Sequence, residues 1–356
     1  MTLTRLTLLS LVLLSSQAFA DDIRIVGNRE ESIRLTHSAP QTNPSLYAQS
    51  TLKPITLLEF ELSDRAQRAV YKRVEQSMQS IENGSQAVTA SKHVQLGMNK
   101  VPVLDQGQHG TCVTFAVTAA IDAALKKGDY VSQLCLLQLG AYLENQGAGL
   151  SGWNGLWGDV ALERINKYGI MNLKNQRSHG CGGVKEYPYR STPHTDMSPE
   201  EYAQYSEDLS SKMMTWEYVF DTSRLASDED RNKAVKDVKT ALDSGDRVVF
   251  GVLLPRTDLG TMGAVGWHSF FSDTWVLTDE IAKDLDSATN LPGHEMIITG
   301  YDDDAVAMDS SGHRHHGLFT LRNSWGAYVA DWGDFYMSYD YFKSLAIEAQ
   351  KIHRVV

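Results

Sequence analysis

The segment Asp105-Gln106-Gly107-Gln108-His109-Gly110-Thr111-Cys112 joins a glycine-rich loop to an apolar stretch over residues 113–125. Lys126-Lys127-Gly128 follows, so the stretch predicts a buried helix with cations and a glycine at its C-terminus. Cys112 then opens this helix, where free backbone N–H groups and the helix dipole stabilise a thiolate. Because a thiol with a lowered pKa is nucleophilic at neutral pH, Cys112 is a candidate nucleophile.

The chain of 356 residues has three cysteines. Cys135 lies among leucines, and Cys181 lies in the loop sequence Gly180-Cys181-Gly182-Gly183. A Cys135–Cys181 disulfide would leave Cys112 as the odd thiol. The alternative is that Cys135 is simply a buried apolar residue.

A thiolate nucleophile needs a proton carrier, and imidazole is the side chain that changes charge near neutral pH. His294 follows Gly293 and opens an apolar strand over 295–299, so its ring can point into a cleft. His109, three residues before Cys112, is the local rival.

Two features argue against metal and nucleic acid as ligands. His313, His315 and His316 form a cluster, but no carboxylate or cysteine completes a metal site, so we interpret the cluster as a solvated hairpin tip and expect no cofactor. The formal net charge is −11. An acidic surface repels phosphate backbones, which excludes most nucleic-acid-binding proteins.

The first twenty residues differ from the rest of the chain. Arg5 precedes a short apolar run over 6–14, and Ala18-Phe19-Ala20 follows. This order is typical of a secretory signal peptide over 1–20. The run is too short to span a bilayer, so we expect a secreted protein, extracellular or periplasmic, without a membrane partner.

Residues 21–91 are expected to form a separate N-terminal segment. Alternating apolar residues on both sides of Gly27-Asn28 predict a β-hairpin; they are Ile23, Ile25, Ile33 and Leu35. A strand over 55–62 follows, and Ser63-Asp64 caps a helix that runs to about Glu82. One apolar face of this helix consists of Ala66, Val70, Val74, Met78 and Ile81. The small, polar stretch 84–92 is typical of a linker or cleavage zone.

From residue 92 to 356, the predicted helices precede most of the predicted strands. Helices are expected over 113–125, 132–144, 157–168 and 228–244, and strands over 248–254, 295–301, 317–322 and 334–338. This order predicts an α+β fold with a helical lobe over about 105–195 and a sheet or barrel lobe over about 196–356.

Several motifs from residue 100 to the C-terminus resemble those of papain-like cysteine peptidases. The segment Asp105-Gln106-Gly107-x-x-Gly110-Thr111-Cys112 resembles the family's active-site motif, and Gly293-His294 resembles its histidine motif. Arg322-Asn323-Ser324-Trp325-Gly326 resembles its asparagine motif. The resemblance implies a two-lobed fold, with a β-barrel-like second lobe and an active site in the cleft between the lobes.

The resemblance also implies a role for each motif residue. Cys112 would be the nucleophile that forms a thioester acyl-enzyme, and His294 would take its proton and later protonate the leaving amine. Asn323 would orient His294, and Trp325 would shield their hydrogen bond. The Gln106 side chain and the Cys112 backbone N–H would form the oxyanion hole. The implied partners are protein or peptide substrates, and the implied state is a monomer.

This sequence departs from the family pattern around the motifs. Trp153 replaces a family cysteine, so the family's disulfides cannot be transferred to this chain. Leu156 replaces a glycine of the substrate pocket, in which Gly155 and Gly293 are also implied. An insertion over about 196–230 is expected to lie over the cleft and change specificity.

By the same resemblance, residues 21–91 are expected to be a propeptide that lies across the cleft as an inhibitor. The alternative is an accessory domain that is never removed. Two other functions compete with that of an active peptidase. One is a thiol amidase or transglutaminase-type enzyme, which the pair Gln106 and Asn323 disfavours. The other is an inactive binding protein, which retention of Cys112 and His294 disfavours.

Overall fold

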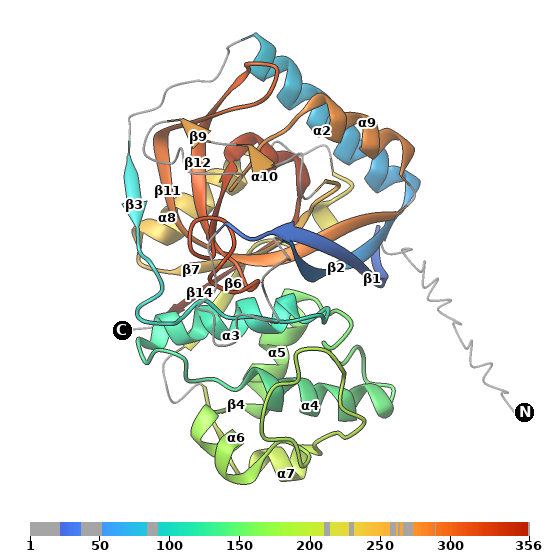
Figure 1. Cartoon of the computed structure of the whole chain (residues 1–356), viewed down its shortest axis with the longest axis vertical. Helices are drawn as coiled ribbons and strands as arrows, with labels where there is room; N and C mark the ends of the chain where they lie inside the picture. Colours follow the sequence, from blue (N-terminus) through green and yellow to red (C-terminus); the bar gives the residue numbers. More distant parts are fainter. Residues whose placement is uncertain are drawn as a thin grey trace, which may run out of the picture.

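The computed structural model describes residues 22–36, 52–83, 92–209, 214–227, 231–256, 261–262, 264–265, 273–288 and 290–354. The expected signal peptide and most of the expected linker therefore lie outside the described residues. The described chain forms two lobes, a helical one and one built around a large sheet (Figure 1). The α+β, two-lobed fold predicted from the sequence is confirmed.

The helical lobe contains helices α3 to α7 and a short ribbon. Its elements are α3 (Cys112–Leu125), α4 (Gln133–Asn145), α5 (Gly158–Tyr168), β4 (Ile170–Met171), α6 (Leu173–His179), α7 (Pro199–Ala203) and β5 (Ser206–Glu207). All residues of α3 except Ala124 are buried, because this helix packs against α4 and α5 on one side and the sheet on the other. Its apolar composition over the whole circumference suits this position between the lobes.

The sheet lobe is built on strands in the order β6-β14-β7-β11-β12-β13-β10-β8. They are β6 (Met214–Phe220), β7 (Arg247–Leu253), β8 (Thr261–Met262), β10 (Thr274–Trp275), β11 (Asn290–Met308), β12 (Arg314–Arg322), β13 (Asp334–Ser338) and β14 (Ala346–Arg354). The short strands β3 (His93–Gln95) and β9 (Ala264–Val265) pair with β11. The 3₁₀ turn η2 (Thr222–Arg224) and helices α8 (Asn232–Asp243), α9 (Asp279–Ser287) and α10 (Tyr339–Leu345) complete this lobe.

The N-terminal segment is part of the sheet lobe. Strand β1 (Ile23–Arg34) pairs antiparallel with β2 (Leu52–Leu62), and β2 pairs antiparallel with β11. The β-hairpin predicted around Gly27-Asn28 is wrong. The register shifts between Ile25 and Gly27, so Gly27 lies in a β-bulge and the strand continues beyond it. The partner of β1 is β2 instead.

The helix predicted after Ser63 is confirmed as α2 (Asp64–Glu82), with the Ser63 side chain accepting from the Ala66 backbone N–H. Its predicted apolar face is buried against α9 and α10. Figure 1 shows α2 and α9 side by side on the outside of the sheet lobe. The N-terminal segment therefore shares the core of the second lobe rather than forming a core of its own.

The predicted lobe boundary at residue 195 is wrong. Helix α7 contacts α4 and α5, and β5 pairs with β4, so residues 196–209 belong to the helical lobe. The apolar ring of Tyr202 explains this, because it is buried in a cluster with Cys135 and Cys181. Within the insertion, β6 pairs with β14 at the sheet edge away from β11. The described part of the insertion therefore does not cover the cleft as expected.

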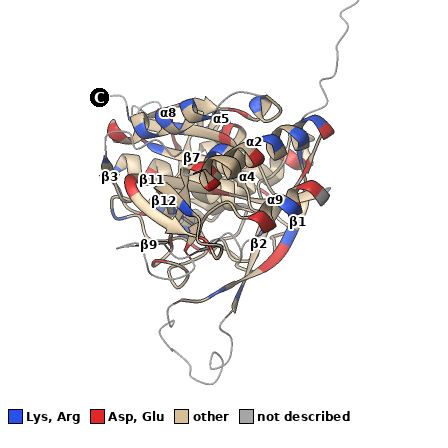
Figure 2. Cartoon of the chain, turned by 90° about the horizontal axis from the view of Figure 1, so that it is seen from above, with Lys and Arg blue, Asp and Glu red and all other residues tan. Residues whose placement is uncertain are grey.

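The predicted Cys135–Cys181 disulfide is confirmed, with the two Cα atoms 4.9 Å apart. It joins α4 to the loop after α6, and Cys112 is a free cysteine. Among the described residues, no helix is long and apolar enough to cross a membrane. Figure 2 shows acidic and basic residues interspersed on the face that includes α2 and β1.

Candidate active site

Cys112 is the first residue of α3, and its side chain is fully buried. Hydrogen bonds from the backbone of Glu295, Val113 and Cys112 itself favour the thiolate. Burial outweighs them and, together with the nearby Glu295 carboxyl, raises the pKa of the thiol to about 12. The lowered pKa expected at a helix start is therefore not realised, because no water reaches the sulfur to solvate the thiolate.

His294 lies on β11, directly before the residue whose backbone hydrogen-bonds to the Cys112 sulfur. Its Nε2 is 2.8 Å from Asn323 Oδ1, and its ring stacks on Trp325 with centroids 4.5 Å apart. Burial lowers the pKa of the imidazole to about 4 despite the Asn323 contact, so the ring is neutral. Its buried Nδ1 has no hydrogen-bond partner and is the nitrogen left for a further contact.

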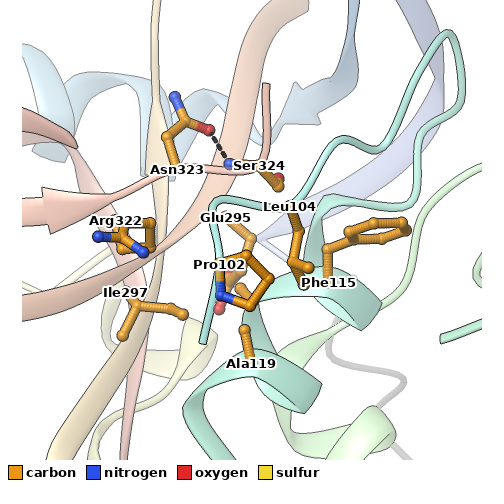
Figure 3. Close-up of a pocket in the computed structure, with 10 residues that line it drawn as sticks. Pro102, Leu104, Phe115, Ala119, Glu295, Ile297, Arg322, Asn323 and Ser324 are labelled. Atoms are coloured by element: carbon orange, nitrogen blue, oxygen red, sulfur yellow. Dashed lines mark hydrogen bonds between the residues drawn. The ribbon is translucent and has the colours of Figure 1, made fainter. Parts of the chain in front are cut away.

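Asn323 follows β12 in the Asn323 loop, which we define as residues 323–326. Its Oδ1 also accepts from the Ser324 backbone N–H at 2.6 Å, as the dashed line in Figure 3 marks. Because a backbone N–H can only donate, this contact identifies the oxygen of the amide and thereby the oxygen that faces His294. Nε2 of His294 then carries the proton, and Nδ1 is free to accept one.

Gln106 lies in the Gln106 loop, defined as residues 105–107, and is fully buried. Its Oε1 accepts from the Ser324 hydroxyl at 2.7 Å, and its backbone N–H donates to the Ser324 carbonyl at 2.9 Å. Its Nε2 donates to the His109 carbonyl at 2.8 Å and to the Thr56 carbonyl at 3.3 Å. The amide expected to bind an oxyanion thus faces a backbone carbonyl of β2.

His109 does not share this arrangement. Its Nε2 is 2.7 Å from the Pro188 carbonyl, and its ring packs edge-on against Trp153 and Tyr187 in the helical lobe. Burial lowers its pKa. The structure therefore pairs His294, and not its local rival His109, with Asn323.

Two of the three expected substrate-pocket residues, Gly155 and Gly293, lie against the N-terminal strands, and the third, Leu156, is buried. A side chain on Gly155 would come within 3.1 Å of both Ile25 and Leu58. Gly293 pairs with Leu58, and a side chain on it would collide with the Phe60 ring. Leu156 is 2 % exposed. The Asn28 amide further donates to Asn154 Oδ1 at 3.0 Å, so β1 and β2 bridge both lobes.

A small, largely apolar cavity lies between α3, β11 and the Asn323 loop (Figure 3). Pro102, Phe115 and Ile297 contribute to its wall, and the side chains of Glu295 and Asn323 also line it. Burial and the nearby Glu348 carboxyl raise the pKa of Glu295 well above its usual range, which favours the protonated form of this carboxyl. No sequence motif indicates a buried acid directly after His294.

The interpretation of the histidine cluster as a solvated tip is corrected for one residue. His315 is fully buried, with its Nε2 3.4 Å from Asp309 Oδ2, and His313 Nδ1 is 3.1 Å from the same carboxylate. Asp309 explains the burial, because it provides an acceptor for an otherwise costly buried ring. Within the described part of the chain, no group of three or more potential ligands is arranged for a metal ion.

Comparison with known proteins finds similarity at the level of structure. No protein-family model and no curated protein matches the sequence. Xylellain, a cysteine protease from Xylella fastidiosa, matches with a TM-score of 0.45 and 18 % identity over 76 % of this chain and 88 % of that chain.

Two further matches have similar values. Digestive procathepsin L 3 of the Tenebrio molitor larval midgut has a TM-score of 0.43 and 19 % identity, over 76 % of this chain and 71 % of that chain. Bromelain protease from Ananas comosus in complex with the E64 inhibitor has a TM-score of 0.44 and 16 % identity, over 74 % and 98 %. Papain-like cysteine proteases are thus among the solved structures that match. The TM-scores and identities are low, so the case for function rests on the site residues.

Proposed function

We propose that this chain is a papain-like cysteine endopeptidase that hydrolyses peptide bonds in protein or peptide substrates. One observation carries the proposal. The neutral His294 ring bonds Asn323 through Nε2, keeps Nδ1 free, and directly precedes Glu295, whose backbone hydrogen-bonds to the free thiol of Cys112. The Gln106 amide is held by the Ser324 hydroxyl, next to Asn323. This combination supplies a nucleophile, a base, an orienting amide and an oxyanion donor.

The reaction follows from these groups. His294 Nδ1 takes the proton of Cys112, and the thiolate attacks the substrate carbonyl while Gln106 and the Cys112 backbone N–H stabilise the oxyanion. The C–N bond then breaks, His294 protonates the leaving amine, and a thioester remains on Cys112. Water, deprotonated by His294, hydrolyses the thioester and regenerates the thiol.

We further propose that the protein is secreted as a zymogen, with residues 21–91 as a removable inhibitor. Strand β2 pairs with β11 up to Gly293, directly before His294, and the Asn28 side chain of β1 lies against Gly110, two residues before Cys112. Burial keeps the thiol and the imidazole neutral. A thiolate–imidazolium pair needs solvation or strong local dipoles, so removal of these strands should favour the pair. The Thr56 carbonyl also holds the Gln106 amide that a substrate would need.

Substitution of the two catalytic groups tests the peptidase. Cys112→Ala should abolish peptide hydrolysis, and His294→Ala should lower kcat/KM by roughly 10³-fold or more, since it removes both proton transfers. His109→Ala is the matched control, because this ring faces Pro188, and it should retain most of the activity. Cleavage of peptides by the Cys112→Ala protein would contradict the assignment, as would a larger loss in His109→Ala than in His294→Ala.

A further inference from the structure

Two neighbouring loops hold an ammonium group at one end of the covered cleft. Lys53 Nζ of β2 donates to Asp105 Oδ2 at 2.5 Å and to the Trp325 carbonyl at 2.7 Å. The side chains of Lys53 and Asp105 are 21 % and 34 % exposed, so the charge pair is largely shielded from water. Asp105 belongs to the Gln106 loop and Trp325 to the Asn323 loop.

The loops fix the two acceptors before any amine binds. Asp105 and Trp325 form an antiparallel bridge, and the Gly326 backbone N–H donates to the Leu104 carbonyl at 2.9 Å. Asp105 Oδ1 accepts from the Gly107 backbone N–H at 3.0 Å, which leaves Oδ2 for the ammonium. A side chain on Gly326 would come within 3.2 Å of the Lys53 ammonium, so the glycine keeps this space open.

The position of Lys53 relative to Thr56 identifies which side of a substrate this site would receive. The Thr56 carbonyl faces the Gln106 amide and therefore marks the position of the reacting bond. Lys53 is three residues away along β2, next to Trp325, whose ring stacks on His294. Because His294 must reach the leaving nitrogen, this is the leaving-group side of the cleft.

We propose that Asp105 and the Trp325 carbonyl form a specificity subsite for a lysine side chain within three residues of the scissile bond, on the leaving-group side. In the full-length chain Lys53 occupies this subsite as an internal ligand. The inference rests on the proposed peptidase function and adds the chemical class of substrate that the cleft prefers.

The test is a kinetic comparison of quenched peptides on the protein matured from the full-length chain. Each peptide carries Lys or Met at one of the first three leaving-group positions. We expect a kcat/KM for one Lys position roughly fivefold above that for Met, the ratio typical of a partly exposed charge pair. The ratio should approach one in Asp105→Asn and in Gly326→Ala, and it should shrink at 1 M salt.

Two controls separate the subsite from general charge effects. Asp237→Asn removes the same charge from a pair with Lys233 on α8 and should keep the wild-type ratio. Moving the lysine to the acyl side should make the ratio insensitive to Asp105→Asn. Cleavage without a lysine preference, or a preference that Asp105→Asn leaves intact, would overturn the subsite alone. Absence of all cleavage by the matured protein would overturn the peptidase function and the subsite with it.

Discussion

Glu348 shows how single buried carboxyls couple this fold to pH. It is fully buried on β14, accepts from the Gly158 backbone N–H at the start of α5 at 3.0 Å, and accepts from the Gln350 amide at 2.7 Å. Burial raises its pKa to about 7. It therefore joins the sheet lobe to the helical lobe through a contact whose charge changes near neutral pH.

The sign of the effect on stability follows from this raised pKa. Below about pH 4.5 the carboxyl is protonated in both the folded and the unfolded chain, and its contribution is fully present. As the pH rises to about 7, the Glu348 carboxyl loses its proton in the unfolded chain but keeps it in the folded chain. The free energy of unfolding should therefore fall by about 3 kcal/mol. Glu348→Gln keeps an acceptor for Gly158 and should remove this loss, as measured by urea unfolding at pH 4.5, 5.5 and 7.

The comparison of variants separates Glu348, together with the Glu295 carboxyl whose pKa it raises, from the other titrating groups. His294, with its lowered pKa, contributes in the opposite direction but equally in both proteins. Glu217→Gln alters a surface carboxyl paired with Lys351 and should keep the wild-type pH dependence. Identical pH dependence of Glu348→Gln and the wild type would show that the carboxyl is not the responsible group.

At the scale of elements, we expect strand β2 to control access to the candidate active site. Leu58 is 2 % exposed between Gly293 of β11 and Gly155 of the helical lobe. Leu58→Asp would lose about 2 kcal/mol of apolar burial and place an unpaired charge there, so β2 should separate from β11. We expect iodoacetamide to alkylate Cys112 roughly tenfold faster or more at pH 7, as followed by mass spectrometry.

The matched control for this prediction is Val26→Asp, which places the same charge at a position on β1 that is 46 % exposed. In this variant, iodoacetamide should alkylate Cys112 at the wild-type rate. Circular dichroism on each variant separates opening of β2 from global unfolding. Equal alkylation rates for folded Leu58→Asp and the wild type would contradict the covering role of β2.

Some features of the site and of strand β1 could be predicted from the sequence, and others could not. Gln106, Cys112, His294 and Asn323 could be proposed as site residues from the sequence because each stands in a short motif with local spacing. The contact of Thr56 with Gln106 had no such signal, because a backbone carbonyl carries no sequence signature. The continuous strand β1 was missed because Gly27 suits a bulge as well as a turn, and the choice depends on pairing with β2.

For the whole molecule, the disulfide should determine the stability of the helical lobe. It closes a loop of 46 residues between α4 and the segment after α6, which corresponds to about 4 kcal/mol in the chain-entropy estimate. The double variant Cys135→Ala and Cys181→Ala should therefore unfold at clearly lower urea concentration than the wild type. Cys112→Ala removes a buried thiol without a cross-link and should cost about 1 kcal/mol or less. Equal losses in the two variants would exclude a specific role of the cross-link.

The pairing of β2 with β11 affects the order in which parts of the protein are synthesised and fold. Glu61 of β2 pairs with Asn290 of β11, so β2 pairs with a segment that is synthesised more than two hundred residues later. Contacts of such long sequence separation form late in folding. Yet β11 is also the strand that carries His294. We therefore expect that, during synthesis, no stage exists in which the thiol and the imidazole meet before the blocking strand is available, which protects the producing cell without a separate inhibitor.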